Sequence, residues 1–387
     1  MAGDSEGRKF IEFAPRVRKS PFYAATRRWG YTAYTVYNHM AMPLYYGSSE
    51  ADFWRLINDV TLWDVAAERQ VEITGPDAAR LTQMLTPRDL ADCAVGQCKY
   101  VLITDADGGV INDPVLLRLG DDHFWLSLAD SDVVLWAKGV AVAAGLDVAV
   151  EEPDVSPLQI QGPKSVDVLR DLFGGWIDEL RYFRFRETEL DGIPLVVSRT
   201  GWSSERGYEV FLRDGRHGDA LWEAIMAAGK PYGIAPAAPN QIRRIEGGMI
   251  SYGTDATRAE NPFELGLGRL VDLDQEAEFI GKAALRRIAA QGVKRLRVGL
   301  ELDGPPLDAG NEDFWPVIGG DGRTGKLTSC VYSPRLEKNI AMAIVPIADA
   351  APGTRVTVET PGGTLAATVV ALPFYDPKKA IPLGIVA

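Results

Sequence analysis

Three short motifs carry the polar and aromatic side chains that stand out in this sequence, and each is built around glycine. GGVINDP (Gly108–Pro114) follows a Gly-Gly turn with Asn-Asp-Pro, so two polar side chains lie at the start of a strand. Taken alone, this pattern is that of a hairpin with turn-forming residues. TGWSSERGYE (Thr200–Glu209) has glycines on both sides of a tryptophan and leads Tyr-Glu into an apolar strand. Because a carboxylate buried in such a strand needs hydrogen-bond donors, Glu209 predicts a ligand that offers N–H groups.

The third motif, RRIEGGMISYG (Arg243–Gly253), combines charged side chains with two adjacent glycines. Arg244 and Glu246 are compatible with an ordinary exposed ion pair. Inside a helix, Gly247 and Gly248 would each cost about 1 kcal/mol relative to alanine. The pattern therefore predicts that something approaches the backbone closely at these glycines.

Signatures of several common enzyme classes are absent from the sequence. There is no Walker A phosphate loop, no strand-borne G-x-G-x-x-G, no G-x-S-x-G nucleophile elbow and no H-E-x-x-H zinc motif. The three cysteines cannot form a disulfide framework, and we interpret Cys93 and Cys330 as core residues. The three histidines are not paired at ligand spacing, so no metal site is expected.

The composition is that of a globular protein with an acidic surface. The 387 residues are 46% hydrophobic and 24% charged, and the formal net charge is −12. This charge argues against nucleic acid and anionic membrane surfaces as main partners. The longest apolar stretch, 132–150, is broken by Lys138 and Asp147, and the basic N-terminal arm, 1–22, has no secretory h-region. We therefore expect a cytoplasmic protein without membrane spans.

Strand-like and helix-like segments alternate along the chain, which predicts an α+β fold. Tyr100–Ala129 predicts three strands joined by two turns, and Asp130–Ala144 predicts a helix. Asn240–Gly253 is also predicted to be helical. From Leu296 on, the pattern predicts an all-β terminal domain, which a linker near Arg287–Val293 precedes.

In their order and spacing, these motifs resemble the folate-dependent aminomethyltransferase family, which includes the T-protein of the glycine cleavage system. The likeness covers nearly the whole chain. Other stretches that carry it are AMPLYYGSSEAD (Ala41–Asp52), LWDVA (Leu62–Ala66), IQGP (Ile160–Pro163), FIGKAAL (Phe279–Leu285), LTSCVYSPRL (Leu327–Leu336) and the closing ALPFYDP. Each motif is weak alone, and the ordered set is specific.

The resemblance implies a three-lobed α+β fold arranged like a cloverleaf, with folate in a central channel. It predicts a discontinuous N-terminal α+β domain at 1–65 and 153–265, interrupted by an inserted α+β domain at 66–152. A linker region at 266–293 leads to a β-barrel-like C-terminal domain at 294–387. The expected partner is a small-molecule methyl donor, and a homodimer is left open.

Within that family, the sequence is most similar to the branch that demethylates dimethylsulfoniopropionate. The stretches that carry this likeness are AYTVYNHM (Ala33–Met40), WDVAAERQVEI (Trp63–Ile73), INDPVLL (Ile111–Leu117), WLSLADSDV (Trp125–Val133) and the segment Pro239–Asp255. In T-protein, an aspartate assigned to the aminomethyl chemistry holds the place of Asn112. An asparagine cannot carry charge or shuttle a proton, so this departure argues against aminomethyltransferase activity. The neighbouring Asp113 keeps a carboxylate nearby.

This branch implies methyl transfer from a sulfonium to N5 of tetrahydrofolate, giving 5-methyltetrahydrofolate and 3-methylthiopropionate. A sulfonium is already an activated methyl donor, so alignment of nitrogen, carbon and sulfur is the main requirement. We assign no residue to bond making, and Asn112 and Asp113 are candidates for positioning the reactants. Trp202 and Tyr37 are expected to enclose the cation, with core packing as the alternative for both rings. Ser127 is expected to hydrogen-bond the donor's carboxylate.

For the folate, the resemblance points to Glu209, because a carboxylate accepts two parallel hydrogen bonds from an aminopyrimidine edge. Tyr208 and Tyr100 are expected to wall the pterin. Arg244 is a candidate to balance a ligand carboxylate, and a structural role is equally compatible with the sequence.

Three other functions are alternatives. The first is a folate-dependent demethylase of methylated amines or methoxy compounds, with the folate half of the site unchanged. The second is an aminomethyltransferase with a lipoyl carrier as partner, against which Asn112 counts. The third is a non-catalytic folate-binding scaffold, like the iron–sulfur assembly relatives of the family. Those relatives carry a K-G-C-Y-x-G-Q-E signature that is missing from this sequence.

Overall fold

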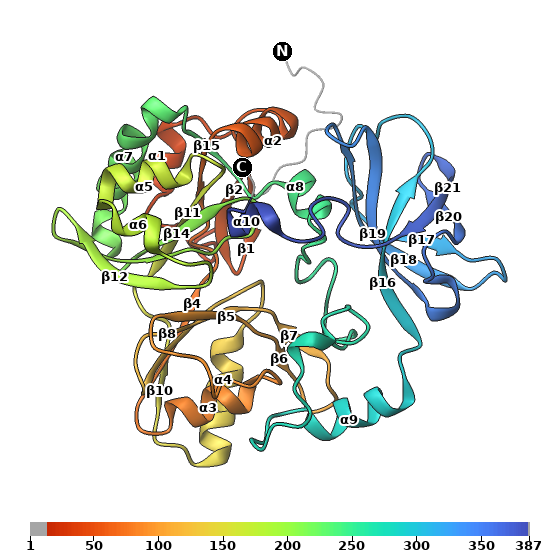
Figure 1. Ribbon diagram of the computed structural model, residues 1–387, viewed down its shortest axis with the longest axis horizontal. Helices are drawn as coiled ribbons and strands as arrows, with labels where there is room; N and C mark the ends of the chain where they lie inside the picture. Colours follow the sequence, from red (N-terminus) through yellow and green to blue (C-terminus); the bar gives the residue numbers. More distant parts are fainter. Residues whose placement is uncertain (1–13, 386–387) are drawn as a thin grey trace.

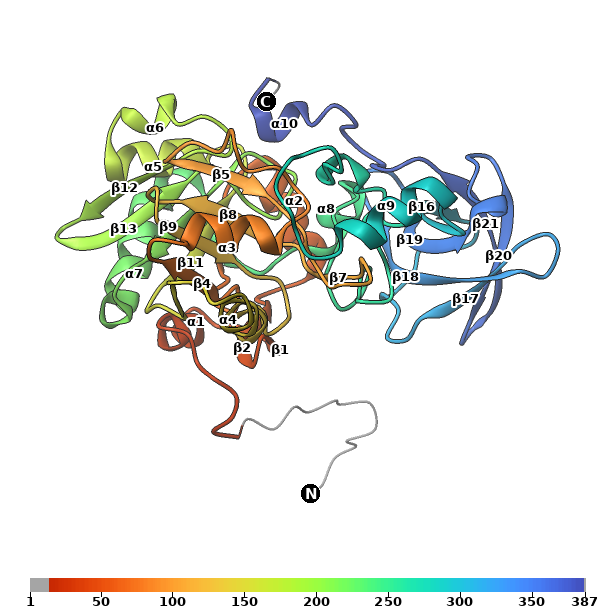
Figure 2. The same cartoon turned by 90° about the horizontal axis from the view of Figure 1, so that it is seen from below.

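The computed structural model describes residues 14–385, which form three lobes around a common centre (Figure 1). Two lobes each contain an open sheet with helices, and the third is a closed β-barrel. Seen from below, the barrel lies at one end and the two sheets at the other (Figure 2). The predicted α+β, three-lobed fold with a C-terminal barrel is therefore confirmed. Most of the basic arm, 1–13, lies outside the described residues.

The first lobe is built on a six-stranded sheet whose strands come from separate parts of the chain. Its strands are β3 (Thr61–Asp64), β11 (Ser156–Gln161), β12 (Phe185–Leu190), β13 (Ile193–Ser198), β14 (Gly207–Leu212) and β15 (Ala235–Ala237). They lie in the order β12-β13-β14-β11-β3-β15, and within this sheet only β15 pairs in parallel, with β3. Both strands next to β11 are paired along both edges, so the register fixes which side chains of β11 and β14 point to each face of the sheet.

Helices pack on the apolar face of this sheet and close the first core. They and the adjoining hairpin are α1 (Tyr23–Arg28), β1 (Ala33–Tyr37), β2 (Met40–Tyr45), α5 (Ser165–Phe173), α6 (Trp176–Glu179), η1 (Gly215–His217), α7 (Gly218–Gly229) and η2 (Lys230–Tyr232). The helix α2 (Ser49–Asn58) instead packs Leu56 in a separate cluster with Trp63 of β3. Apolar residues in SVDVLRDLF recur at helical spacing, so α5 buries Val166, Val168 and Leu169 against the sheet. From α7, Leu221 and Trp222 complete the same core.

The second lobe has a five-stranded antiparallel sheet covered by two helices. Its elements are β4 (Gln70–Thr74), α3 (Ala78–Leu85), β5 (Gln97–Tyr100), β8 (Val115–Arg118), β9 (His123–Ser127), α4 (Val133–Ala144) and β10 (Ala149–Glu151). The strand order is β10-β4-β9-β8-β5. The predicted helix at 130–144 is present as α4. The division into discontinuous and inserted domains stays a prediction.

The prediction of three strands over Tyr100–Ala129 is wrong in detail. Between β5 and β8, a separate hairpin forms from β6 (Ile103–Thr104) and β7 (Val110–Asn112). Pro114 has no N–H to continue a ladder, so the chain leaves β7 and enters β8 in a different sheet. This break places Asp113 at the junction between the two sheets.

The third lobe is a barrel of six strands, and a helix precedes it. The elements are η3 (Gly268–Leu270), α9 (Lys282–Gln291), β16 (Arg295–Leu302), β17 (Trp315–Ile318), β18 (Thr324–Ser333), β19 (Lys338–Pro346), η4 (Ile347–Asp349), β20 (Arg355–Thr360) and β21 (Gly363–Val370). The strands close in the order β16-β19-β18-β17-β20-β21. The expected linker near Arg287–Val293 is largely α9, because KAALRRIAAQ consists of strong helix formers and buries Ala284 and Leu285.

The predicted helix over Asn240–Gly253 is also too long. Only α8 (Gln241–Glu246) is helical, and Asn240 caps it by accepting a hydrogen bond from the Arg243 N–H. Gly248 has a φ of 64°, a left-handed conformation that ends the helix. The close approach predicted at Gly247 exists: a Cβ there would lie 2.1 Å from the Ser204 Oγ.

After the barrel, the chain returns to the first lobe and ends in α10 (Ala380–Leu383) (Figure 1). Asp376 accepts hydrogen bonds from the backbone N–H groups of Ala380 and Ile381, which fixes the start of this short helix. Arg199 of the first lobe donates from Nη2 to the Leu383 carbonyl at 2.9 Å. The last described residues are therefore attached to both the barrel and the first lobe.

Candidate functional site

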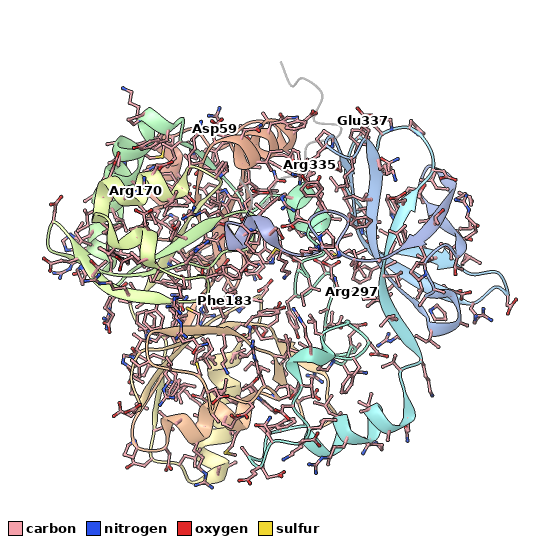
Figure 3. All side chains as sticks on the ribbon, in the orientation of Figure 1. Asp59, Arg170, Phe183, Arg297, Arg335 and Glu337 are labelled. Atoms are coloured by element: carbon pink, nitrogen blue, oxygen red, sulfur yellow. The ribbon has the colours of Figure 1, made fainter. Side chains whose placement is uncertain are left out.

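A cavity of about 820 Å³ lies at the centre, where the three lobes meet. This volume is within the range of small-molecule sites. In Figure 3, the labelled side chains of Phe183 and Arg297 lie on either side of this centre, and both line the cavity. Its wall includes residues from all three lobes, among them Tyr37, Glu68, Arg88, Lys99, Tyr100, Asp113, Ser127, Gln159, Trp202, Glu209, Arg269, Arg297 and Lys379. Most of the predicted site residues are thus brought together.

Glu209 on β14 is a buried carboxylate in the cavity wall. The sheet register places it beside Gln159 on β11 and Ser198 on β13. Gln159 donates from Nε2 to Glu209 Oε1 at 2.9 Å, and the Thr200 hydroxyl donates to Oε2. The side chain is 3% exposed, and burial raises the pKa of Glu209 against the effect of these donors. The carboxylate is therefore held in a fixed orientation toward the cavity.

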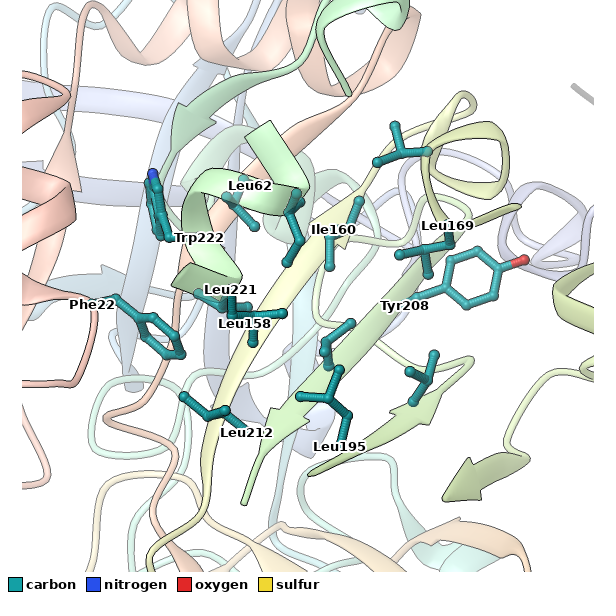
Figure 4. Close-up of a cluster of buried hydrophobic side chains, with 14 of the residues drawn as sticks. Phe22, Leu62, Leu158, Ile160, Leu169, Leu195, Tyr208, Leu212, Leu221 and Trp222 are labelled. Carbon is teal, nitrogen blue, oxygen red and sulfur yellow. The ribbon is translucent and has the colours of Figure 1, made fainter. Parts of the chain in front are cut away.

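The prediction that Tyr208 walls the pterin is wrong, because Tyr208 precedes Glu209 on the same strand. Successive side chains of a strand point to opposite faces. The Tyr208 ring is fully buried in the first core, among Ile160, Leu169 and Leu195 (Figure 4). Of the two tyrosines, only Tyr100 lines the cavity.

Glu68 is a second carboxyl group of the cavity, and the sequence analysis missed it. It follows β3 in a short loop, and its Oε1 accepts a hydrogen bond of 3.2 Å from the same Gln159 Nε2 that bonds Glu209. Burial, together with the nearby carboxyls of Glu209 and Asp113, raises the pKa of Glu68 well above its usual value. In the sequence it is one charged residue in a loop, with no pattern that separates it from a solvated surface glutamate.

Asp113 and Tyr100 form a hydrogen-bonded pair in the wall contributed by the second lobe. The Tyr100 hydroxyl donates to Asp113 Oδ2 at 2.8 Å. Asp113 Oδ1 is buried and has no hydrogen-bond partner in the protein. Burial raises the pKa of Asp113 to about 7 and that of Tyr100 well above its ordinary value. An unpartnered acceptor in a cavity wall is suited to a ligand N–H group.

Asn112 does not reach the cavity, so it does not position a reactant by direct contact. Its Nδ2 donates to the Ala129 carbonyl at 3.0 Å and to Ser131 Oγ at 2.8 Å, while its Oδ1 accepts from the Ala129 N–H at 3.0 Å. Asn112 and Asp113 point in opposite directions, and only Asp113 lines the cavity. Asn112 holds the chain after β9, next to Ser127.

Tyr37, Ser127 and Trp202 line the cavity from three different elements. Burial, followed by the charges of Asp113 and Glu68, raises the pKa of Tyr37 well above its usual value. Ser127 Oγ accepts a hydrogen bond of 2.9 Å from Gln70 Nε2. The three residues therefore line the same cavity as the carboxyl groups of Glu68, Asp113 and Glu209.

Trp202 is fixed by its neighbours at both ends of the residue. Its indole Nε1 donates to the Ile250 carbonyl at 3.1 Å, and its backbone N–H donates to Gln159 Oε1 at 3.3 Å. The guanidinium of Arg244 lies 5.7 Å from the ring centroid. The ring is thus oriented by the Ile250 carbonyl and the Arg244 guanidinium, while Gln159 fixes the backbone, and Trp202 also lines the cavity.

Arg244 is buried outside the cavity. Of the two roles that the sequence allowed, its contacts fit the structural one and not the binding of a ligand carboxylate. Its guanidinium pairs with Asp255 and donates to Ser329 Oγ of the barrel at 2.8 Å. It is 2% exposed, and it does not line the cavity. Arg244 therefore links α8 to the barrel lobe and is not free to bind a ligand carboxylate.

Cations form another part of the cavity wall and were not predicted. Arg269 and Lys379 are exposed to solvent, whereas Arg297 donates to the Leu265 and Gly248 carbonyls at 3.0 Å each. Burial and the neighbouring charge of Arg269 lower the pKa of Arg88, which is half-buried. These positive charges come from distant parts of an acidic chain and suit the carboxylates of an anionic ligand.

Asp113→Asn should remove a pH-dependent cost to stability. The folded pKa of Asp113 is about 7 and the ordinary value is 3.8, so the folded protein holds a proton there that the unfolded chain releases. Its ionisation therefore costs stability as the pH rises from about 4 to about 7. We expect the variant to gain about 2–3 kcal/mol more at pH 8 than at pH 5, measured by urea unfolding. Asp92→Asn, on the exposed surface of the same lobe, is the control, and an equal gain at both pH values would contradict the assignment.

The part of the chain that the structure describes contains neither a metal-binding cluster nor a membrane-spanning helix. Within residues 14–385, no group of three or more His, Cys, Asp and Glu side chains is arranged to hold a metal ion. No helix in the same range is long and apolar enough to cross a lipid bilayer.

Comparisons with known proteins agree with this architecture. The family model "GCVT N-terminal domain" matches residues 22–275, and "Glycine cleavage T-protein C-terminal barrel domain" matches 295–376. Dimethylsulfoniopropionate demethylase DmdA of Ruegeria pomeroyi is 42% identical over 358 residues, which cover 92% of this chain and 96% of that protein. An aminomethyltransferase of Streptomyces avermitilis is 34% identical over 348 residues, 87% of this chain and 92% of that protein.

A solved structure gives independent support for the fold. The crystal structure of the glycine cleavage system aminomethyltransferase T from Bartonella henselae matches with a TM-score of 0.84 at 24% identity, covering 93% of this chain and 98% of that chain. At this identity, the likeness shows the fold alone. With both family models matched along the chain, the protein belongs to the glycine cleavage T-protein family, the folate-dependent enzymes that its motifs indicated.

Proposed function

We propose that this enzyme is a tetrahydrofolate-dependent demethylase that moves a methyl group from a sulfonium donor, dimethylsulfoniopropionate, to N5 of tetrahydrofolate. The products are 5-methyltetrahydrofolate, 3-methylthiopropionate and the proton that N5 loses once its bond to the methyl carbon has formed and the carbon–sulfur bond has broken. The observation that carries the proposal is the pre-oriented Glu209 carboxylate in the wall of a cavity that also holds Trp202 and Tyr37. The 42% identity to a demethylase of this donor supports the choice of substrate.

The residues of the cavity fit tetrahydrofolate. Glu209 offers two carboxylate oxygens to the aminopyrimidine edge of the pterin, and Asp113 offers its unpartnered Oδ1. Arg269 and Lys379 are suited to the carboxylates of the glutamate tail. When bound, tetrahydrofolate supplies the N5 lone pair that accepts the methyl group.

The residues of this chain bind the methyl donor and the folate, orient them toward each other, and exclude water from the site. A sulfonium needs no protonation to leave as a thioether, so the site requires alignment more than acid or base catalysis. Trp202 and Tyr37 replace the water around the cation with aromatic faces, which stabilise it by about 1–2 kcal/mol per good contact. Ser127 is the candidate to hydrogen-bond the donor's carboxylate.

The test is an assay of the purified protein with tetrahydrofolate and a panel of methyl donors, in which 5-methyltetrahydrofolate is measured directly. The panel contains dimethylsulfoniopropionate, a methylated amine and a methoxy-aromatic acid. We expect turnover with the sulfonium. Turnover only with another donor, or formation of methylenetetrahydrofolate with an aminomethylated lipoyl carrier, would reject the proposal.

Trp202→Ala should weaken binding of the sulfonium donor more than that of an isostere that lacks the sulfonium charge. A suitable pair is dimethylsulfoniopropionate and 4-methylpentanoate, in which a CH group replaces the sulfonium sulfur and the rest of the skeleton is the same. Loss of one aromatic face should lower the preference for the cation about tenfold, as measured by calorimetry. Trp54→Ala, in the exposed part of α2, is the control. Equal losses for both ligands would mean that Trp202 only packs.

A further inference from the structure

Glu68 lies where the donor-binding and folate-binding residues meet. Its carboxyl accepts from Gln159, the side chain that also bonds Glu209 and accepts from the Trp202 N–H. Its backbone carbonyl accepts a hydrogen bond of 2.6 Å from Gln70 Nε2, which also donates to Ser127. Glu68 is therefore tied through two amide side chains to Ser127 and Trp202 on one side and to Glu209 on the other.

The surroundings of Glu68 lack positive charge. The titratable groups that face it are Glu209 on β14, Asp113 after β7 and the Tyr37 phenol on β1, all of them acidic. In the described part of the chain, none of the three carboxyls forms an ion pair with a lysine, arginine or histidine. An isolated buried carboxylate is costly unless a cation compensates it.

The three carboxyl groups differ in the hydrogen bonds that they already accept from the protein. Glu209 already accepts from Gln159 and Thr200 and, under the proposed function, faces the pterin. Asp113 accepts from Tyr100. Glu68 also accepts a single hydrogen bond, but its 3.2 Å contact with the neutral amide of Gln159 is longer than the 2.8 Å bond from Tyr100 to Asp113. Glu68 is therefore the carboxyl whose charge the protein compensates least directly.

We infer that Glu68 is the counter-charge of the methyl donor, a specificity-determining carboxylate through which this cavity selects an onium cation over a neutral donor of the same shape. The inference rests on the proposed function, because it places the donor in the wall formed by Tyr37, Ser127 and Trp202. On this inference, the Glu68 carboxylate attracts the positive charge of the donor, an attraction that aromatic faces alone supply only weakly.

The protonation state of Glu68 is expected to change when a cationic donor binds. Its neighbourhood raises the pKa of Glu68, so a bound cation beside it favours ionisation and releases a proton. The affinity for a cationic donor should therefore fall as the pH is lowered, because the proton and the donor compete for the same carboxylate. An isostere that lacks the sulfonium charge gains nothing from the ionised form and should not release a proton.

The test is calorimetric binding of dimethylsulfoniopropionate and 4-methylpentanoate to the full-length protein and to Glu68→Gln, in buffers of different ionisation enthalpy. The variant should lower the preference for the cation at least about tenfold, change the affinity for the isostere little, and release fewer protons. Glu68→Asp should retain a preference for the cation. Asp64→Asn, which alters another buried carboxyl four residues earlier and outside the cavity, is the matched control.

Several outcomes would overturn the inference. Glu68→Gln with the wild-type preference would exclude a role for its charge, and equal losses for both ligands would mean that Glu68 only shapes the cavity. Turnover by the wild-type protein decides the proposed function separately. An enzyme that demethylates the sulfonium while Glu68→Gln keeps its preference would retain the function and reject the role of Glu68.

Discussion

Glu209→Gln is expected to lower the affinity for tetrahydrofolate about a hundredfold or more. The carboxylate presents two acceptors to an aminopyrimidine edge, and hydrogen bonds to charged groups contribute about 1.5–3 kcal/mol each. A carboxamide keeps one acceptor and turns an N–H group toward either the ligand or the donors Gln159 and Thr200. The loss is measured by fluorescence titration or calorimetry with tetrahydrofolate under anaerobic conditions.

The matched control for this variant is Glu187→Gln. Glu187 lies on β12 of the same sheet and forms an exposed ion pair with Arg213, so its removal changes the charge by the same amount outside the cavity. Circular dichroism and thermal unfolding would establish that both variants are folded. If folded Glu209→Gln bound tetrahydrofolate as tightly as the wild type, the assignment of the pterin to Glu209 would be wrong.

Arg244→Met should destabilise the protein by about 3–5 kcal/mol, the usual cost of breaking a buried ion pair by removing one partner. Burial works against the ionised form of Asp255, but Arg244 and the hydroxyls of Ser329 and Thr328 lower the pKa of this carboxyl. Without the guanidinium, the Asp255 charge stays buried with only neutral donors. Urea unfolding, followed by tryptophan fluorescence, measures the loss.

A double variant tests the physical cause of this loss. In Arg244→Met with Asp255→Asn, no uncompensated charge is left, so part of the stability should return. Arg170→Met, which removes exposed pairs with Asp167 and Asp178, is the control and should cost less than about 1 kcal/mol. If Arg244→Met were as mild as the control, the link between α8 and the barrel would not depend on this pair.

The sequence predicted the fold better than it predicted the site. The three lobes followed from the family resemblance that the ordered motifs carry, whereas the periodicity along the chain predicted only the α+β character and the all-β C-terminal domain. Periodicity alone could not have assembled the first lobe, because its strands come from separate parts of the chain. Side-chain direction was the weak point: Tyr208 and Glu209 are adjacent, as are Asn112 and Asp113, and in each pair only one residue lines the cavity. Which member does so depends on strand register, and that register is set by partners far away in the chain.

The cavity residues that the sequence did not predict were missed for a different reason. Glu68, Arg88, Arg297 and Lys379 meet at one cavity although they lie in different lobes. No local pattern connects residues so far apart, and each has the appearance of an ordinary surface charge in its own segment. The error at α8 was local, since the cost of Gly247 and Gly248 was recognised and still outweighed by the apolar pattern.

The strand order of the first lobe also bears on how the chain assembles as it leaves the ribosome. β3 ends at Asp64, but its antiparallel partner β11 begins at Ser156 and its parallel partner β15 only at Ala235. Every strand of the second lobe's sheet lies in the sequence between Asp64 and Ser156. The second sheet can therefore be complete while β3 is still unpaired at both edges. Vectorial synthesis thus favours the internal lobe as the first to fold, with the earliest-made segment among the last to find its neighbours.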